Sequence, residues 1–288
     1  MKLVLGSAQF GMDYGISNEL GKVNEKEVRK ILSLASLNGI YEVDTAINYG
    51  TSQSILGRQN KKFSFSTKLP NFCLDSHSIK NKVHEYLENS YSELSTNKID
   101  ILYLHSSYQL LENNGERLHA VLEELKFNKK IKRIGISVYD LDKTLEIISK
   151  FDIDVIQAPI NIFDRRFLDK NFILEIRKKN INLYARSIFL QGLLLMPFNK
   201  VPNYFHKWKD IFVNWNSWLT ENNLTPLQAC ISYVMNIDDI NNFIVGVNSV
   251  DQFKEIIQCY RASEKINNFK HEYLNISNLI DPTLWKIH

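Results

Sequence analysis

Short apolar runs alternate with longer amphipathic segments along nearly the whole chain. Runs of a few apolar residues between polar or turn-forming residues are typical of parallel strands buried on both faces. The pattern predicts eight such strands, at residues 3–5, 41–43, 63–67, 101–104, 131–136, 155–156, 181–185 and 243–245.

Amphipathic helices are predicted after most of these strands. The clearest covers residues 25–37, where Val28, Ile31, Leu32 and Ala35 share one face at helical spacing. Further helices are predicted at 78–94, 118–127, 142–149, 170–178 and 251–260. Strands that alternate with helices indicate successive βαβ units and therefore a parallel sheet.

Eight units in 288 residues leave 36 residues for each unit (288 divided by 8). This repeat predicts an α/β fold, a (β/α)8 TIM barrel of eight parallel strands, forming one domain over residues 1–288. The alternative is an open doubly wound sheet, which usually carries a Gly-x-Gly-x-x-Gly motif after its first strand. Gly6 and Gly11 do not match that motif, so the barrel is favoured.

Residues 186–240 are too long for a single strand-to-helix connection. They predict a helical insertion after strand seven, with helices at 205–219 and 226–234. Trp208, Trp215 and Trp218 belong to the first of these. We expect most of these aromatic side chains to form the core of the extra helix pair.

The charge balance gives no sign of a nucleic-acid or membrane partner, because 35 basic and 32 acidic residues leave a net charge of only +3. Cys73, Cys230 and Cys259 show no paired spacing, which argues against a disulfide framework or a metal site and fits a reducing cytoplasm. The apolar run at the N-terminus is too short for a signal peptide. We expect a cytoplasmic protein, a monomer or weak homo-oligomer.

Four polar residues, Asp44, Tyr49, Lys68 and His105, stand at or just past the ends of three consecutive predicted strands. Barrel geometry points these ends toward one mouth, so the four side chains are expected to converge. Each alone has an ordinary explanation as a cap, a turn residue or a solvated side chain. Four reactive types at three successive strand ends are harder to attribute to packing.

Their combination suits carbonyl reduction. A hydride that reaches a carbonyl carbon leaves negative charge on the oxygen, which needs a proton. Tyr49 could supply it, and the ammonium of Lys68 would lower the tyrosine pKa from about 10. Asp44 would hold Lys68, and His105 would hydrogen-bond the carbonyl oxygen.

The sequence resembles the aldo-keto reductase family, bacterial members included. The ordered matches lie at residues 5–11, 43–46, 49–50, 66–68, 100–105, 134–137, 156–161 and 244–246. The resemblance implies the barrel, a catalytic tetrad of Asp44, Tyr49, Lys68 and His105, and a nicotinamide cofactor bound without a Rossmann domain.

The resemblance also assigns cofactor positions. Ser137 and Gln157 match the pair that holds the nicotinamide carboxamide, whereas Val138 stands where the family usually has Asn. Arg186 replaces an aromatic residue that stacks on the nicotinamide. Its guanidinium could stack there, bind the cofactor's pyrophosphate or bind an acidic substrate; the alternative is a structural salt bridge.

Gly246 and the residues after it match the family's adenosine side. Members that require NADPH often place Lys or Arg there, but this chain has Asn248, Ser249 and Gln252, followed by Glu255. Neutral donors and a helix N-terminus can still hold a phosphate. The expected cofactor is therefore NADPH, with NADH as the alternative.

A small-molecule carbonyl is the expected partner. The predicted pocket mixes aromatic and polar side chains, which suits sugars or small hydroxylated carbonyls, and the resemblance extends to members linked to surface-carbohydrate metabolism. Two alternatives stay open: a cofactor-binding regulatory barrel without turnover, and a nicotinamide-using epimerase. The expected pocket residues are Phe10, Met12, Tyr14, Ser106, Tyr108, Phe163, Arg165 and the 186–205 loop.

Overall fold

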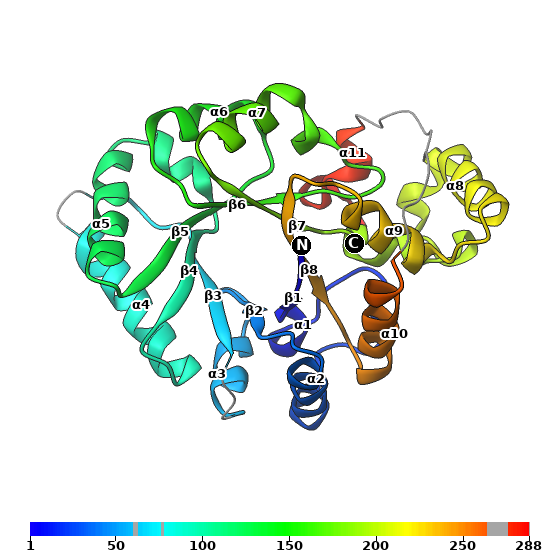
Figure 1. Ribbon diagram of the computed structural model, residues 1–288, viewed down its shortest axis with the longest axis horizontal. Coiled ribbons are helices and arrows are strands. Elements are labelled where there is room, and N and C mark those ends of the chain that lie inside the picture. Colours follow the sequence, from blue (N-terminus) through cyan, green and yellow to red (C-terminus); the bar gives the residue numbers. More distant parts are fainter. Residues whose placement is uncertain (60–62, 76–77, 264–275, 288) are drawn as a thin grey trace.

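The computed structural model describes residues 1–59, 63–75, 78–263 and 276–287. Within these ranges, parallel strands in chain order close into a barrel (Figure 1), because the first strand pairs with both the second and the last. The predicted barrel is therefore confirmed, and the open sheet is excluded. The strands are β1 (Lys2–Gly6), β2 (Glu42–Asp44), β3 (Ser64–Leu69), β4 (Ile99–Leu104), β5 (Ile131–Ser137), β6 (Val155–Pro159), β7 (Asn182–Arg186) and β8 (Ile240–Gly246).

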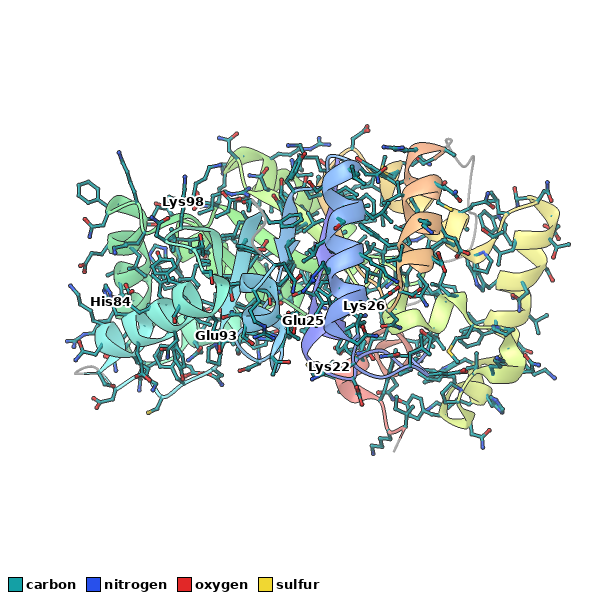
Figure 2. All side chains as sticks on the ribbon, turned by 90° about the horizontal axis from the view of Figure 1, so that it is seen from below. Lys22, Glu25, Lys26, His84, Glu93 and Lys98 are labelled. Atoms are coloured by element: carbon teal, nitrogen blue, oxygen red, sulfur yellow. The ribbon has the colours of Figure 1, made fainter. Side chains whose placement is uncertain are left out.

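Amphipathic helices surround the strands (Figure 1). In α2 (Glu25–Leu37), the side chain of Asn24 caps the first turn, and the buried residues are the four that share the predicted face. Figure 2 shows α2 beside α10 (Val250–Arg261), with the Glu25 and Lys26 labels near the end where α2 begins. The other outer helices are α4 (Ile79–Leu94), α5 (Gly115–Phe127), α6 (Leu141–Lys150) and α7 (Lys170–Lys178).

The helix bounds agree with the periodicity better than the strand bounds do. The predicted limits of α2 and α7 are found unchanged. Several strands run further than their apolar runs; β6 continues through Gln157, and β3 includes Lys68. The short helices α1 (Ala8–Gly11) and α3 (Ser52–Gly57) were not predicted, because so few residues cannot display a helical repeat.

The interior of the barrel is filled by side chains from the strands, including Val4, Ile101, Tyr103 and Tyr184. Tyr103 is fully buried and lies against Gly135 of β5. A Cβ atom at Gly135 would lie 2.3 Å from Cδ1 of Tyr103. A residue without a side chain is therefore required there for the ring to fit inside the barrel.

The insertion between β7 and β8 carries α8 (Lys209–Glu221), which lies outside the ring of strands (Figure 1), and α9 (Pro226–Met235). The helix predicted at 205–219 is wrong in its first turn, since residues Asn203–Trp208 form a separate 3₁₀ helix. The aromatic core is confirmed: Phe212, Trp215 and Trp218 are buried.

The same core covers the end of the described chain, where α11 (Ser277–Ile280) and a following turn pack against the insertion. Trp285 contacts Phe205 edge-on, with ring centroids 4.9 Å apart. Segments far apart in the sequence thus meet beside the mouth of the barrel. No helix in the described ranges combines the length and apolar character needed to span a membrane.

Candidate active site

A cavity of about 680 Å³ opens at the carboxyl ends of the strands, and Asp44, Tyr49, Lys68 and His105 all line it. Asp44 ends β2, Lys68 lies near the end of β3, and His105 directly follows β4. Tyr49 lies in the loop between β2 and α3. The structure therefore brings together the four side chains that the sequence places at strand ends.

Asp44 and Lys68 form a buried ion pair, with Nζ of Lys68 2.5 Å from Oδ2 of Asp44. Lys68 also donates to the carbonyl oxygen of Thr45 at 3.0 Å. The other oxygen of Asp44 accepts hydrogen bonds from Nε2 of Gln157 at 2.9 Å and Oγ of Ser66 at 3.2 Å. Burial lowers the pKa of Lys68 below its usual value, and Asp44 opposes that shift. The carboxylate is thus satisfied on both oxygens.

Tyr49 lies beside this pair, with Nζ of Lys68 5.0 Å from the centroid of its ring. The rings of Tyr49 and His105 meet edge-on, their centroids 6.1 Å apart. Burial, and then Asp44, raise the pKa of Tyr49 above its usual value, whereas Arg186 lowers it. Burial has the largest effect on this pKa, and a lowering by Lys68 stays a prediction. Tyr49 keeps its proton near neutral pH.

Two glycines allow the loop that carries Tyr49 to approach α1. A Cβ atom at Gly11 would lie 1.8 Å from the carbonyl oxygen of Tyr49, so only glycine fits there. Gly50 has a φ of 56°, in the left-handed region that glycine adopts without strain. Ser52 begins α3 directly after the loop and donates to the carbonyl oxygen of Ser7 at 2.9 Å. These contacts tie the Tyr49 loop to the end of β1.

His105 is uncharged at neutral pH. Burial lowers its pKa to about 4, and the positive charges of Lys68 and Arg186 act in the same direction. Its Nδ1 atom is buried and has no hydrogen-bond partner among the described residues. A neutral imidazole retains one N–H, so it can still donate to a bound group.

The same cavity extends to the predicted cofactor residues. Strand register places Ser137, which ends β5, opposite Gln157 in the middle of β6. One prediction is corrected: Ser249 does not line the cavity but caps α10, accepting a hydrogen bond from the backbone N–H of Gln252. The predicted cofactor residues that do line the cavity are Ser137, Gln157, Arg186, Gly246, Asn248, Gln252 and Glu255.

Arg186 stacks on an aromatic ring that was not predicted to belong to the site. Its guanidinium carbon lies 4.0 Å from the ring centroid of Tyr139. Nη2 donates to the carbonyl oxygen of Val138 at 2.9 Å, and Nη1 donates to Oγ of Ser187 at 3.3 Å. Among the described residues Arg186 has no ion pair with a carboxylate, so the structural salt bridge is not found. Tyr139 stands two residues after Ser137, just past the end of β5, and this position could have indicated from the sequence that it belongs to the site.

The predicted substrate side needs several corrections. Phe10 is fully buried in the core and does not reach the cavity, because α1 directs its ring inward. Tyr108 lies outside the lining, with Lys143 over its ring at 4.6 Å. Ser106, Phe163 and Arg165 are also outside it.

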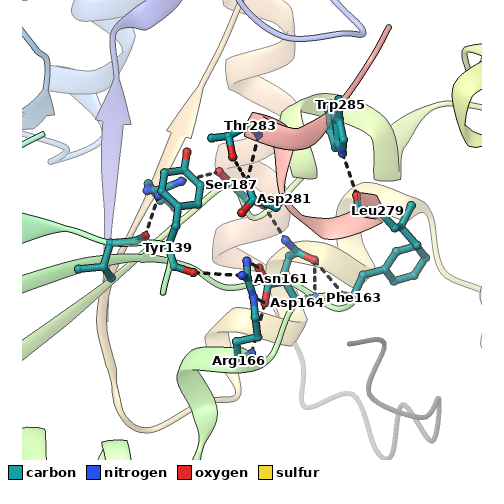
Figure 3. Close-up of polar contacts among 12 residues, drawn as sticks. Tyr139, Asn161, Phe163, Asp164, Arg166, Ser187, Leu279, Asp281, Thr283 and Trp285 are labelled. Carbon is teal, nitrogen blue, oxygen red and sulfur yellow. Dashed lines mark hydrogen bonds and ion pairs between the residues drawn. The ribbon is translucent and has the colours of Figure 1, made fainter. Parts of the chain in front are cut away.

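Met12 and Tyr14 line the cavity as expected, together with Phe189, Gln191 and Leu195 of the loop after β7. Pro282 and Thr283 complete the lining from the far end of the chain. Figure 3 shows Thr283 beside Asp281, whose Oδ1 accepts hydrogen bonds from the backbone N–H and the hydroxyl of Thr283. No local pattern marks this contribution, because it depends on the packing of the terminal segment against the insertion.

Comparison with known proteins finds relatives that are all named as reductases or oxidoreductases. The chain is 27% identical over 186 residues to aldo-keto reductase YhdN of Bacillus subtilis (strain 168), a match that spans 60% of this chain and about half (55%) of that protein. It is 26% identical to the uncharacterized oxidoreductase YqkF of the same organism, over 81% of both chains. It is 24% identical to an NADH-specific methylglyoxal reductase of Escherichia coli (strain K12), over 75% of this chain and 77% of that one.

The fold has solved counterparts as well. The holo form of aldo-keto reductase AKR11C1 from Bacillus halodurans superposes with a TM-score of 0.72, at 19% identity over 94% of each chain. The model of the aldo/keto reductase family matches residues 2–271. The chain therefore belongs to the aldo/keto reductase family, whose members are oxidoreductases.

Proposed function

We propose that this protein is an NAD(P)H-dependent reductase that converts an aldehyde or ketone to an alcohol, with Tyr49 as the proton donor. The observation that carries the proposal is the meeting of Tyr49 with both Lys68 and His105 in one cavity. The buried Asp44 holds Lys68 in place. The complete set argues against a barrel that binds cofactor without turnover.

In the proposed mechanism, Ser137 and Gln157 would hold a reduced nicotinamide, which would provide the hydride for the carbonyl carbon. Tyr49 gives its hydroxyl proton to the carbonyl oxygen as negative charge develops there. His105, neutral at physiological pH, donates a hydrogen bond to the same oxygen. The charge of Lys68 stabilises the resulting tyrosinate until solvent returns the proton.

The residues along the cavity fit a dinucleotide. Gln9 Oε1 and Asn248 Oδ1 are buried without hydrogen-bond partners in the described chain, so each can accept from a bound ligand. Gly246 keeps the wall open, since a Cβ atom there would lie 2.3 Å from Oε1 of Gln9. The N-terminus of α10 favours a phosphate. Ser137 and Gln157 would hold the carboxamide, and Glu255 the adenine end.

We propose that NADH serves as well as NADPH. The extra ribose phosphate of NADPH is usually bound by Lys or Arg. Gly246, Asn248, Gln252 and Glu255 line the cavity in this region, and Lys254 instead pairs with Asp251 at 2.9 Å. The E. coli relative named NADH-specific supports this choice.

The test is to mix the protein with NADPH or NADH and a carbonyl panel of aldoses, glyoxals and nitrobenzaldehyde, and to follow cofactor absorbance. Consumption that disappears in Tyr49→Phe but persists in Tyr41→Phe supports the proposal; Tyr41 is half exposed and outside the cavity. Cofactor binding without consumption would indicate the regulatory barrel. Inversion of a substrate carbon without net consumption would indicate the epimerase.

A further inference from the structure

We propose that Arg186 selects carbonyl substrates that carry an anionic group, a carboxylate or a phosphate. The inference rests on the proposed reductase function and names the substrate class of the same site. Arg186 ends β7 and lines the cavity with Tyr49 and His105. A guanidinium at that place would bind an oxyanion attached to the molecule whose carbonyl is reduced.

The guanidinium of Arg186 keeps N–H donors that are not engaged by the protein. Its contacts to Val138 and Ser187 engage two of the roughly five N–H groups that an arginine carries. Nε is buried without a partner in the described part of the chain. The ring of Tyr139 covers one face at 4.0 Å, which holds the group flat and leaves its edge to meet a ligand.

Arg186 forms no ion pair with a carboxylate among the described residues. Asp44 and Lys68 neutralise each other at 2.5 Å, and His105 is uncharged. Glu255 also lines the cavity but belongs to α10, on the side assigned to the cofactor. One net positive charge therefore remains around the reacting centre. A partly enclosed, low-dielectric cavity of this kind concentrates anions.

Asn161 and Arg166, labelled in Figure 3 with Ser187 and Tyr139, support the backbone that carries the Arg186–Tyr139 pair. Asn161 is fully buried and donates to the carbonyl oxygen of Ser187 at 3.1 Å. Arg166 donates to the carbonyl oxygen of Tyr139 at 3.0 Å. Ser187 itself has a φ of 56°, a left-handed conformation that is unfavourable for serine. The two hydrogen bonds fix the backbone at Ser187 and Tyr139, next to the guanidinium and at the ring that it stacks on.

The test compares a carboxylated benzaldehyde with its methyl ester, which present the same carbonyl and differ in charge. The natural protein is expected to reduce the acid with the higher kcat/KM. Arg186→Gln is expected to lower kcat/KM for the acid about 10- to 100-fold, mainly through KM, and to lower it much less for the ester. Arg186→Lys keeps the charge and should retain part of the preference. The control is Arg177→Gln, an exposed cation on α7 that pairs with Asp239.

Glyceraldehyde and its phosphate form the second substrate pair. A higher kcat/KM for the acid than for its ester, or for the phosphate than for the free sugar, supports the inference. The pair that shows the difference identifies the anionic group as a carboxylate or a phosphate. Equal kcat/KM for acid and ester, and for sugar and sugar phosphate, would overturn it while the proposed reductase stands. Equal losses on charged and neutral substrates in Arg186→Gln, or a loss of cofactor binding by fluorescence, would also overturn it.

Two further controls keep the outcomes separate. If no carbonyl in either pair or in the wider panel consumes cofactor, the proposed function fails, and this inference with it. If Arg186→Gln does not fold, the salt dependence of the natural protein tests the inference. Added salt should reduce kcat/KM for the acid and not for the ester. Salt independence of both would contradict a role for charge.

Discussion

Nζ of Lys68 lies 2.5 Å from Oδ2 of Asp44, and only 1% and 5% of the two side chains are exposed. Each charge depends on the other, because neither is hydrated. The pair lies at the base of the cavity that Tyr49 and His105 also line. Its disruption should therefore affect folding as well as activity.

Lys68→Met is expected to reduce the free energy of unfolding by about 3 kcal/mol, because Asp44 would remain buried without its partner. Denaturant titration measures this. Lys254→Met removes the same side chain from an exposed pair with Asp251 and should leave stability unchanged. The double variant Lys68→Met, Asp44→Asn should recover much of the stability and none of the activity. An unchanged stability in Lys68→Met alone would contradict a tightly buried pair.

Tyr49→Phe is expected to lower kcat about 100- to 10,000-fold, because no other hydroxyl is assigned to protonate the carbonyl oxygen. Cofactor affinity, measured by fluorescence titration, should not change. Because burial raises the pKa of Tyr49, the natural protein should keep the proton-donating form into mildly alkaline solution. A kcat that falls steeply with an apparent pKa near neutrality would argue against Tyr49 as the donor.

His105 should make the fold less stable in acid. Its pKa is about 4 in the folded protein and about 6.5 in an unfolded chain. Between these values the unfolded chain binds more protons, so this stabilisation is complete above the unfolded pKa and is lost as the pH falls through the folded one. Thermal unfolding across this range should show a loss on the order of 2 kcal/mol that is absent in His105→Gln. Parallel pH curves for the two proteins would show that His105 is not buried in its neutral form.

Gly135→Ala should destabilise the barrel by about 1–3 kcal/mol, since the new methyl group would overlap the ring of Tyr103. Chemical denaturation provides the measurement. Adding Tyr103→Leu removes the overlapping ring atoms, so the double variant should be more stable than the two separate losses predict. Strict additivity would mean that the two residues do not share this space.

The predictions from sequence were accurate where a local pattern carries the information. The spacing of Val28, Ile31, Leu32 and Ala35 is the buried face of α2, because an amphipathic helix is determined by residues three and four apart. Strand ends were less accurate: the β2 strand begins at Glu42, and Tyr41 is half exposed. Apolar character alone does not show where hydrogen bonding between strands stops.

Some residues of the candidate site could be predicted from the sequence, and others could not. Asp44, Tyr49, Lys68 and His105 could be found because barrel strands present their carboxyl ends at one mouth; their catalytic roles stay predictions. Phe10 and Ser249 were misplaced, since their positions along the chain are close to the mouth but their side chains face the core and the first turn of α10. Position near a strand end does not determine side-chain direction.

The sequence by itself determined the alternation of strands and helices, the eightfold barrel and the residues at the strand ends, because each follows from periodicity and from their order along the chain. Only the tertiary structure decided the surroundings of Arg186. Its stacking on Tyr139, the support from Asn161 and Arg166, and the approach of Thr283 all join segments distant in sequence. Such contacts depend on how helices and loops pack around the closed barrel, which no local pattern encodes.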